Sequence, residues 1–94
     1  MAVYEVQSTP AFERSAKQLT KKHVRIADIL DAAREVLEQD PSNLSRTHDI
    51  KKLTSVPAGQ GQWRIRIGNH RMRYDIDGET VVLRSINDRR DAYR

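Results

Sequence analysis

The sequence has no cysteine, one tryptophan and one phenylalanine among its 94 residues. Without cysteine there can be no disulfide bonds and no thiolate metal site, so neither can compensate for a small core, and nothing indicates an oxidising compartment. No apolar leader follows Met1, and no apolar run approaches the roughly 18 residues that a membrane-spanning helix needs. We therefore expect a cytoplasmic protein that neither enters nor crosses a membrane.

The length and composition predict a single domain over residues 1–94. Hydrophobic residues make up 37% of the chain and charged residues 32%, which is too apolar for a disordered tail. A chain this short builds one core from two layers of secondary structure. It shows no internal repeat, low-complexity tract or linker, so we place no domain boundary.

The charge is positive and unevenly distributed. The net charge of +4 and the isoelectric point near 9.8 favour an anionic partner such as nucleic acid, an acidic protein or a membrane surface. Lysines stop at Lys52, and every basic residue of the last third is an arginine. Because the planar guanidinium matches phosphate with two donors, this choice indicates recognition of phosphate geometry.

The first half of the chain predicts a strand, two helices and a long loop. Residues 3–8 alternate as a short strand, and Thr9 can then cap a helix with Pro10 at its first position. A second apolar stripe with a 3.6-residue period runs from Ile26 to Leu37, and Asp40-Pro41 ends it. Residues 41–61 are rich in turn formers, interrupted at 49–53 by a possible short strand.

The last third predicts a three-stranded β-meander. Residues 62–67, 70–76 and 79–86 alternate with period two, separated by the hairpin signals Gly68-Asn69 of type II′ and Asp77-Gly78 of type I′. These turns would place Ile67 opposite His70 and Ile76 opposite Glu79. One face is then apolar and packs on the helices. Its residues are Trp63, Ile65, Ile67, Met72, Tyr74, Ile76, Val81 and Leu83.

The same register collects five arginines on the other side, which we call the arginine face. Arg66 would lie opposite Arg71, Arg64 opposite Arg73, and Arg84 beside Arg71. Like charges directly opposed on a sheet are destabilising. A phosphate group bound among them would convert this repulsion into binding energy. The alternative is a solvated face partly neutralised by Asp75, Asp88 or Asp91; we favour the phosphate site because acidic residues are outnumbered.

Taken in order, these motifs resemble the RelE/ParE toxin superfamily, and in particular its RelE branch of mRNA-cleaving toxins. The resemblance covers nearly the whole chain. It is carried by the segments 9–12 (TPAF), 48–53 (HDIKKL), 62–74 (QWRIRIGNHRMRY) and 86–94 (INDRRDAYR). It implies an α+β fold in which two N-terminal helices pack on a mostly antiparallel sheet that ends in a C-terminal meander.

The resemblance also implies a function. A RelE-like chain is the toxin of a type II toxin–antitoxin system and cleaves mRNA on the ribosome by attack of a ribose 2′-hydroxyl on the adjacent phosphate. Neither a metal nor another cofactor is needed, and the expected partners are an acidic RelB-like antitoxin, the ribosome and mRNA. The chemistry needs an acceptor for the 2′-hydroxyl proton, donors for the phosphate charge and assistance to the leaving oxygen.

Site residues follow from the resemblance position by position. Arg64 and Arg66 match basic residues that approach the 2′-hydroxyl and phosphate, and Arg71 matches the phosphate-stabilising arginine. Arg89 matches the residue that assists the leaving group, with Arg90 as its alternative, and Tyr93 matches an aromatic that orients the substrate. Further RNA contacts are expected from Arg73, Arg84, Arg90, Lys21 and Lys22.

Several alternatives stay open at this point. Arginine is a poor proton acceptor, so the general base is unidentified. His70 should lie on the apolar face as a structural residue, His48 would reach the arginine face only if its loop folds that way, and the three histidines show no metal-ligand spacing. A ParE-like inhibitor of DNA gyrase shares the fold, and a non-catalytic module that binds RNA or an acidic protein would share the charge.

Overall fold

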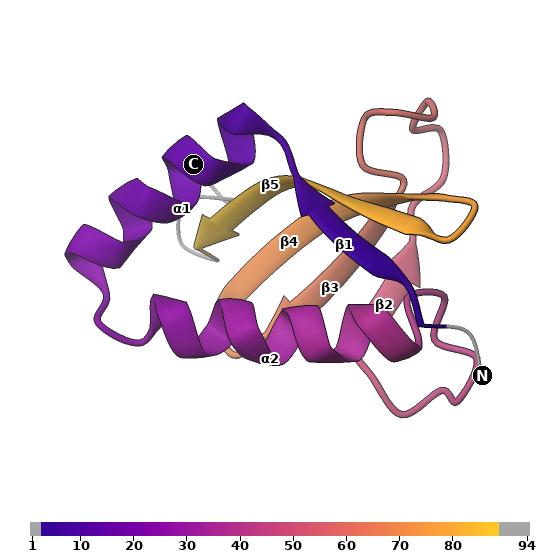
Figure 1. The fold of residues 1–94 in the computed structure, drawn as a ribbon, viewed down its shortest axis with the longest axis horizontal. Coiled ribbons are helices and arrows are strands. Elements are labelled where there is room, and N and C mark those ends of the chain that lie inside the picture. Colours follow the sequence, from indigo (N-terminus) through magenta and orange to yellow (C-terminus); the bar gives the residue numbers. More distant parts are fainter. Residues whose placement is uncertain (1–2, 89–94) are drawn as a thin grey trace.

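A computed structural model describes residues 3–88 and shows two helices against one five-stranded sheet (Figure 1). The strand order is β1-β5-β4-β3-β2; β1 pairs with β5 in parallel and every other pair is antiparallel. The expected α+β class and mostly antiparallel sheet are confirmed. Neither helix is long and apolar enough to pass through a membrane within the described residues. The elements in chain order are β1 (Glu5–Ser8), α1 (Pro10–Lys22), α2 (Ile26–Gln39), β2 (Ile50–Lys52), β3 (Trp63–Ile67), β4 (His70–Asp77) and β5 (Thr80–Asp88).

The start of α1 and the end of α2 lie where the sequence indicates. The Thr9 hydroxyl accepts a hydrogen bond from the Phe12 N–H at 3.1 Å, which satisfies one of the free donors at the start of α1. Pro10 occupies the first turn, where its missing N–H costs nothing. The helix α2 ends at Gln39, immediately before Asp40 and Pro41.

The first hairpin has the predicted register. Ile67 pairs with His70, and the two-residue turn between them carries Gly68 at φ +59°. A positive φ at the first central residue suits a II′ turn, whose twist matches that of the flanking strands. This turn places Arg66 opposite Arg71 as expected.

The second hairpin differs from the prediction by one residue. Asp77 pairs with Thr80, so the turn residues are Gly78 and Glu79, and Ile76 pairs with Val81 rather than lying opposite Glu79. Gly78 has φ +59°, whereas no positive φ is found at Asp77. The chain therefore places glycine at the first central position, where a II′ turn needs it, and avoids the I′ turn that would put Asp77 at positive φ.

A bulge then shifts the β4–β5 register once more. Tyr74 pairs with Leu83 but Arg73 pairs with Ser85, so Arg84 is the extra residue on β5. Arg71 consequently lies opposite Asn87, and the expectation that Arg84 flanks Arg71 is wrong. The bulge also brings Ile86 onto the helix-packed face, where it is 3% exposed.

The core lies between the helices and one face of the sheet. The predicted apolar face is confirmed: five of its residues are buried, and Trp63, Ile67 and Ile76 are partly buried and pack against them. The opposite face of the sheet carries the arginines. The buried cluster consists of Phe12, Ala16, Ala33, Leu37, Ile65, Met72, Tyr74, Val81, Leu83 and Ile86.

Candidate nucleic-acid interface

The β3–β4 hairpin forms two rows of cations across the side of the sheet that faces away from the helices. Arg66 pairs with Arg71 and Arg64 pairs with Arg73, as the turn geometry predicts. All four side chains are half-buried. The directly opposed positions bring their Cβ atoms to roughly 5 Å. Two of the strands thus concentrate positive charge on one part of the arginine face.

A lysine on β2 extends one of these rows and was not singled out from the sequence. Lys51 pairs with Arg64 and is exposed. Ile50 pairs with the buried Ile65 and so lies on the apolar side of the sheet. Because neighbouring residues of a strand point to opposite sides, alternation through residues 49–53 would have placed Lys51 on the arginine face. The row therefore runs Lys51, Arg64, Arg73 across three strands.

One carboxylate lies beside this row. Both terminal nitrogens of Arg64 are 3.4 Å from Oδ1 of Asp49, whose side chain is 55% exposed. At that distance and exposure the pair contributes little to stability. The Asp49 carbonyl accepts the Arg66 N–H at 2.9 Å, which keeps residue 49 beside β3. Asp49 is a carboxylate beside the arginine face that the sequence analysis did not select.

The other end of the arginine face is occupied by a buried carboxylate. Asp75 is 6% exposed and accepts hydrogen bonds from the N–H groups of Gly61 and Gln62, both at 3.0 Å, and from Nε of Arg84 at 2.8 Å. Nε of Arg73 donates to the Gly61 carbonyl at 3.1 Å. Arg73 and Arg84 are thus engaged in holding the loop before β3 against the sheet.

The environment of Asp75 favours its charged form. Burial raises the pKa of the carboxyl, but the Gln62 N–H, the Arg84 guanidinium and the Gly61 N–H outweigh it, so the pKa lies below its ordinary value. Asp75 thus neutralises part of the arginine face by pairing with Arg84, as the alternative to a phosphate site had anticipated for this residue. Asp88 does not do so, because it pairs with buried His70 and lies on the helix-packed side.

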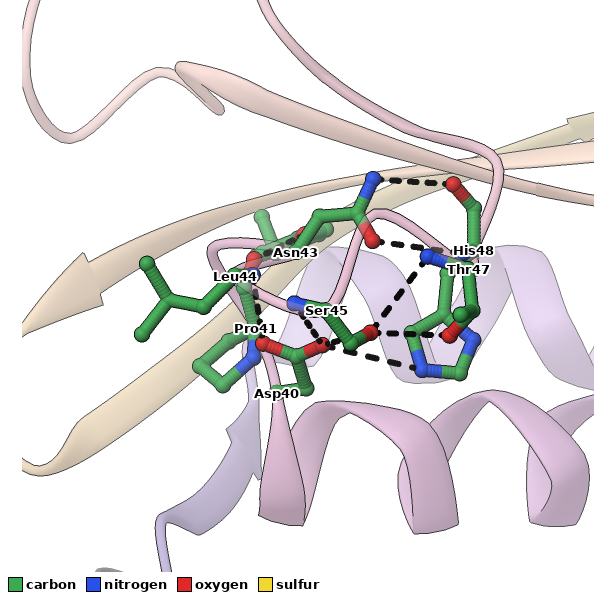
Figure 2. Close-up of polar contacts among 8 residues, drawn as sticks. Asp40, Pro41, Asn43, Leu44, Ser45, Thr47 and His48 are labelled. Carbon is green, nitrogen blue, oxygen red and sulfur yellow. Dashed lines mark hydrogen bonds and ion pairs between the residues drawn. The ribbon is translucent and has the colours of Figure 1, made fainter.

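The connection from α2 to β2 is a loop closed by hydrogen bonds among its own residues (Figure 2). Asp40 accepts bonds from the Leu44 N–H at 2.7 Å and from the Ser45 N–H and hydroxyl at 3.2 and 2.6 Å. The Asn43 amide bonds both backbone groups of His48, at 2.9 and 3.2 Å. Because these bonds fix the backbone of His48, they also fix the position of the next residue, Asp49, just before β2.

Asp40 and His48 face each other within this loop. The Ser45 hydroxyl lowers the pKa of Asp40; burial opposes this, and the Leu44 and Ser45 N–H groups lower it further. Nε2 of His48 lies 3.8 Å from Asp40, so this histidine faces the loop and not the arginine face. The alternative in which His48 reaches the arginine face is therefore not supported.

A buried tyrosine ties this loop to the sheet. The Tyr74 hydroxyl donates to the Pro41 carbonyl at 2.6 Å, and burial raises the pKa of that hydroxyl. The Trp63 ring stacks against Tyr74 at a centroid distance of 6.5 Å, and the Lys52 ammonium lies 5.6 Å from the Trp63 ring. Trp63 and Tyr74 are structural, as predicted.

The remaining predicted residues fall elsewhere. Lys21 and Lys22 are exposed in the last turn of α1, in the helical layer, so the described structure does not bring them together with the arginine face. His70 is buried on the apolar side, as predicted. Arg89, Arg90, Asp91 and Tyr93 lie outside the described residues.

Comparison with known proteins identifies relatives of this chain. The family model described as the ParE toxin of the type II toxin–antitoxin system, parDE, matches residues 6–93. A search of curated proteins found no match. Among solved structures, the RelBE2 toxin–antitoxin complex from Mycobacterium tuberculosis is similar, with 26% identity, a TM-score of 0.73, and coverage of 94% of this chain and 100% of that one.

Two archaeal structures share the fold. The RelB–RelE complex from Methanococcus jannaschii has 22% identity and a TM-score of 0.69, covering 93% of this chain and 94% of that chain. The RelE–RelB complex from Pyrococcus horikoshii OT3 has 21% identity and a TM-score of 0.67, covering 93% and 96%.

Proposed function

This chain belongs to the RelE/ParE superfamily of type II toxin–antitoxin toxins, and we propose that it is a ribosome-dependent mRNA endonuclease. In the proposed reaction the ribose 2′-oxygen attacks the adjacent phosphorus, the 2′-hydroxyl proton passes to an acceptor, and the bond to the 5′-oxygen breaks. The leaving oxygen takes up a proton and departs as a 5′-hydroxyl. Side chains can catalyse each step: one accepts the 2′-hydroxyl proton, cationic donors stabilise the charge on the phosphate, and one gives a proton to the leaving oxygen.

The observation that carries the proposal is the Arg66–Arg71 pair on the side of the sheet without helices. Arginines at directly paired positions repel each other, and a bound phosphate would offset this repulsion. A phosphate group bound there would accept hydrogen bonds from both forks, and these would strengthen as charge grows on the phosphate oxygens. Arg71 supplies the main stabilisation in this scheme, and Arg66 shares it.

Arg64 and Asp49 complete the described part of the site. Arg64 approaches the attacking ribose, and the Asp49 carboxylate beside it is the proposed proton acceptor, since arginine holds its proton too firmly for that role. Asp49→Asn should therefore lower the cleavage rate by about 10² to 10⁴, the range of a lost general base. Normal cleavage by this variant would remove Asp49 from the mechanism.

The C-terminal segment supplies the remaining roles. β5 ends at Asp88, one residue after Asn87, the partner of Arg71 in the sheet, and Arg89 is the next residue in the chain. Arg89 is proposed to assist the leaving oxygen, with Arg90 as its alternative, and Tyr93 to stack on the substrate. Lys21, Lys22 and Arg90 are proposed as further RNA contacts, whereas Arg73 and Arg84 contribute mainly by holding the loop.

The proposed partners are the ribosome, mRNA and an acidic RelB-like antitoxin. All three similar structures are complexes of a toxin with its antitoxin, which supports an antitoxin for this chain. The net charge of +4 favours an acidic one. The cytoplasm is the compartment in which these partners meet.

Inhibition of DNA gyrase is the second candidate function. It is favoured by the matching family model, which is described as the ParE toxin. On this alternative the arginine face binds protein, no bond is broken, and Asp49 has no chemical role.

A paired assay separates the two functions. Purified chain is added to translating ribosomes, with mRNA ends mapped, and in parallel to gyrase, with plasmid supercoiling measured. We expect cleavage within codons and unaffected supercoiling, and Arg71→Ala should lower cleavage by about 10² to 10³, as for loss of one transition-state donor. Arg14→Ala, an exposed arginine of α1, is the matched control and should cleave normally. Blocked supercoiling with intact mRNA would establish the gyrase function instead.

A further inference from the structure

Two histidines and an aspartate that are distant in the sequence meet on the helix-packed side of the sheet. His23 follows α1, His70 opens β4, and Asp88 closes β5. The sequence shows no ligand spacing among its histidines, so only the fold brings these residues together. None of them belongs to the arginine face.

The geometry of this cluster approaches that of a metal site. Oδ2 of Asp88 lies 3.3 Å from Nε2 of His23 and 3.9 Å from Nε2 of His70, and one ligand atom of each residue lies within 4.8 Å of the others. A tetrahedral zinc ion with bonds of about 2.0 to 2.2 Å holds its ligand atoms roughly 3.3 to 3.6 Å apart. The ligand atoms of the cluster would have to approach one another by up to about 1.5 Å when an ion binds.

His70 supplies an independent reason to expect a ligand. It is only 7% exposed, and within the described chain neither of its buried ring nitrogens has a hydrogen-bond partner. Buried polar atoms in folded proteins are almost always satisfied, because an unsatisfied one costs about 1 to 3 kcal/mol. The His23 ring meets His70 edge-on at 5.5 Å between centroids and therefore offers it no hydrogen bond in this arrangement. A metal ion on Nε2 would satisfy the nitrogen that faces Asp88.

We propose that His23, His70 and Asp88 bind a zinc ion. Two imidazoles and one carboxylate suit a borderline metal such as Zn²⁺ and do not suit Mg²⁺ or Ca²⁺, which prefer all-oxygen sites. The fourth position is open to water. The His23 side chain is 36% exposed and lines a surface cavity together with Asn69 and His70, so an ion can reach the ligands from solvent.

Two cationic side chains lie beside the proposed zinc site, and their positive charge would weaken zinc binding. Lys22 and Arg25 line the same cavity, but both residues are exposed, so solvent and salt screen their charges. The ion would join the segment after α1, the start of β4 and the end of β5. Since it binds only the folded chain, it should raise the thermal stability.

The test is zinc binding by the full chain after removal of metals with a chelator. Titration calorimetry with Zn²⁺ should give one site per chain, Co²⁺ should give the visible absorption of a low-symmetry site, and Mg²⁺ should not bind. His23→Ala and Asp88→Asn should each weaken zinc binding by at least about a hundredfold and abolish the zinc-dependent rise in melting temperature. His23 is partly exposed, so its removal leaves the core intact.

His48→Ala is the matched control, because His48 has its own aspartate neighbour, Asp40, at 3.8 Å and belongs to no such cluster among residues 3–88. It should bind zinc like the unchanged chain. Absence of saturable zinc binding, or equal affinity in the His23→Ala and Asp88→Asn variants, would overturn the proposal, as would an equal loss in His48→Ala. None of these readouts depends on RNA cleavage or gyrase inhibition.

Discussion

Replacing Asp75 with asparagine should release the loop before β3 from the sheet. The two carboxylate oxygens accept separate backbone bonds, Oδ2 from Gly61 and Oδ1 from Gln62, and Oδ2 also accepts from Arg84. An asparagine keeps one oxygen and places an NH₂ donor where the other stood, so it cannot accept both backbone bonds. The variant also leaves Arg84 without its charged acceptor.

The magnitude follows from these contacts. Hydrogen bonds to a charged group contribute about 1.5 to 3 kcal/mol each, and at least one is lost outright while the others weaken. The Arg84 contribution is discounted because its side chain is 33% exposed. Removing a buried charge recovers part of the desolvation cost, which leaves a net loss of about 2 to 3 kcal/mol. For a domain of this size that lowers the melting temperature by roughly 10 to 20 °C.

Urea denaturation followed by circular dichroism measures the loss, and limited proteolysis measures exposure of residues 53–62. Asp77→Asn, an exposed aspartate of the same strand, is the control and should change stability by less than about 0.5 kcal/mol. If Asp75→Asn matches that control and the loop resists protease, Asp75 does not hold the loop, and Arg73 and Arg84 are not committed to it.

Three further predictions follow from the same contacts. Tyr74→Phe removes the hydroxyl that bonds the Pro41 carbonyl and should destabilise the chain by about 1 to 2 kcal/mol in urea, while cooperative unfolding is retained; an unchanged midpoint would contradict a structural role for this bond. Gly61→Ala would put a Cβ 2.9 Å from that of Arg73 at φ +82° and should cost more than Gly78→Ala, which has φ +59° and open space; equal melting temperatures would contradict the close contact. Asp40 and Asp75 have lowered pKa values in the folded chain, so their carboxylates stabilise it above the unfolded value of about 3.9, and this contribution is lost as the pH falls through the folded values. The urea midpoint should therefore drop more steeply in acid for the unchanged chain than for Asp75→Asn, and parallel curves would contradict the assignment.

Local chemistry made much of this fold predictable. Thr9 and Pro10 specify the start of α1 through capping, and Pro41 ends α2, because each effect acts within a few residues. The Gly68 turn set the Arg66–Arg71 pairing, since a two-residue loop allows only one register. The alternation of apolar and polar residues along each strand was enough to predict the apolar side of the meander.

Long-range packing decided the rest. The alternation of the sequence gives no sign of the bulge at Arg84, which brings Arg84 to Asp75 and Ile86 into the core. The position of the loop on Asp75 and the meeting of His23 with His70 also join segments far apart in the chain. Short-range patterns in the sequence determined where helices and turns form and which side of each strand is apolar. Outside the hairpin of β3 and β4, only the tertiary structure decided which charged groups become neighbours, because a shift of one residue, or the docking of one loop, changes these contacts while leaving the local patterns unaltered.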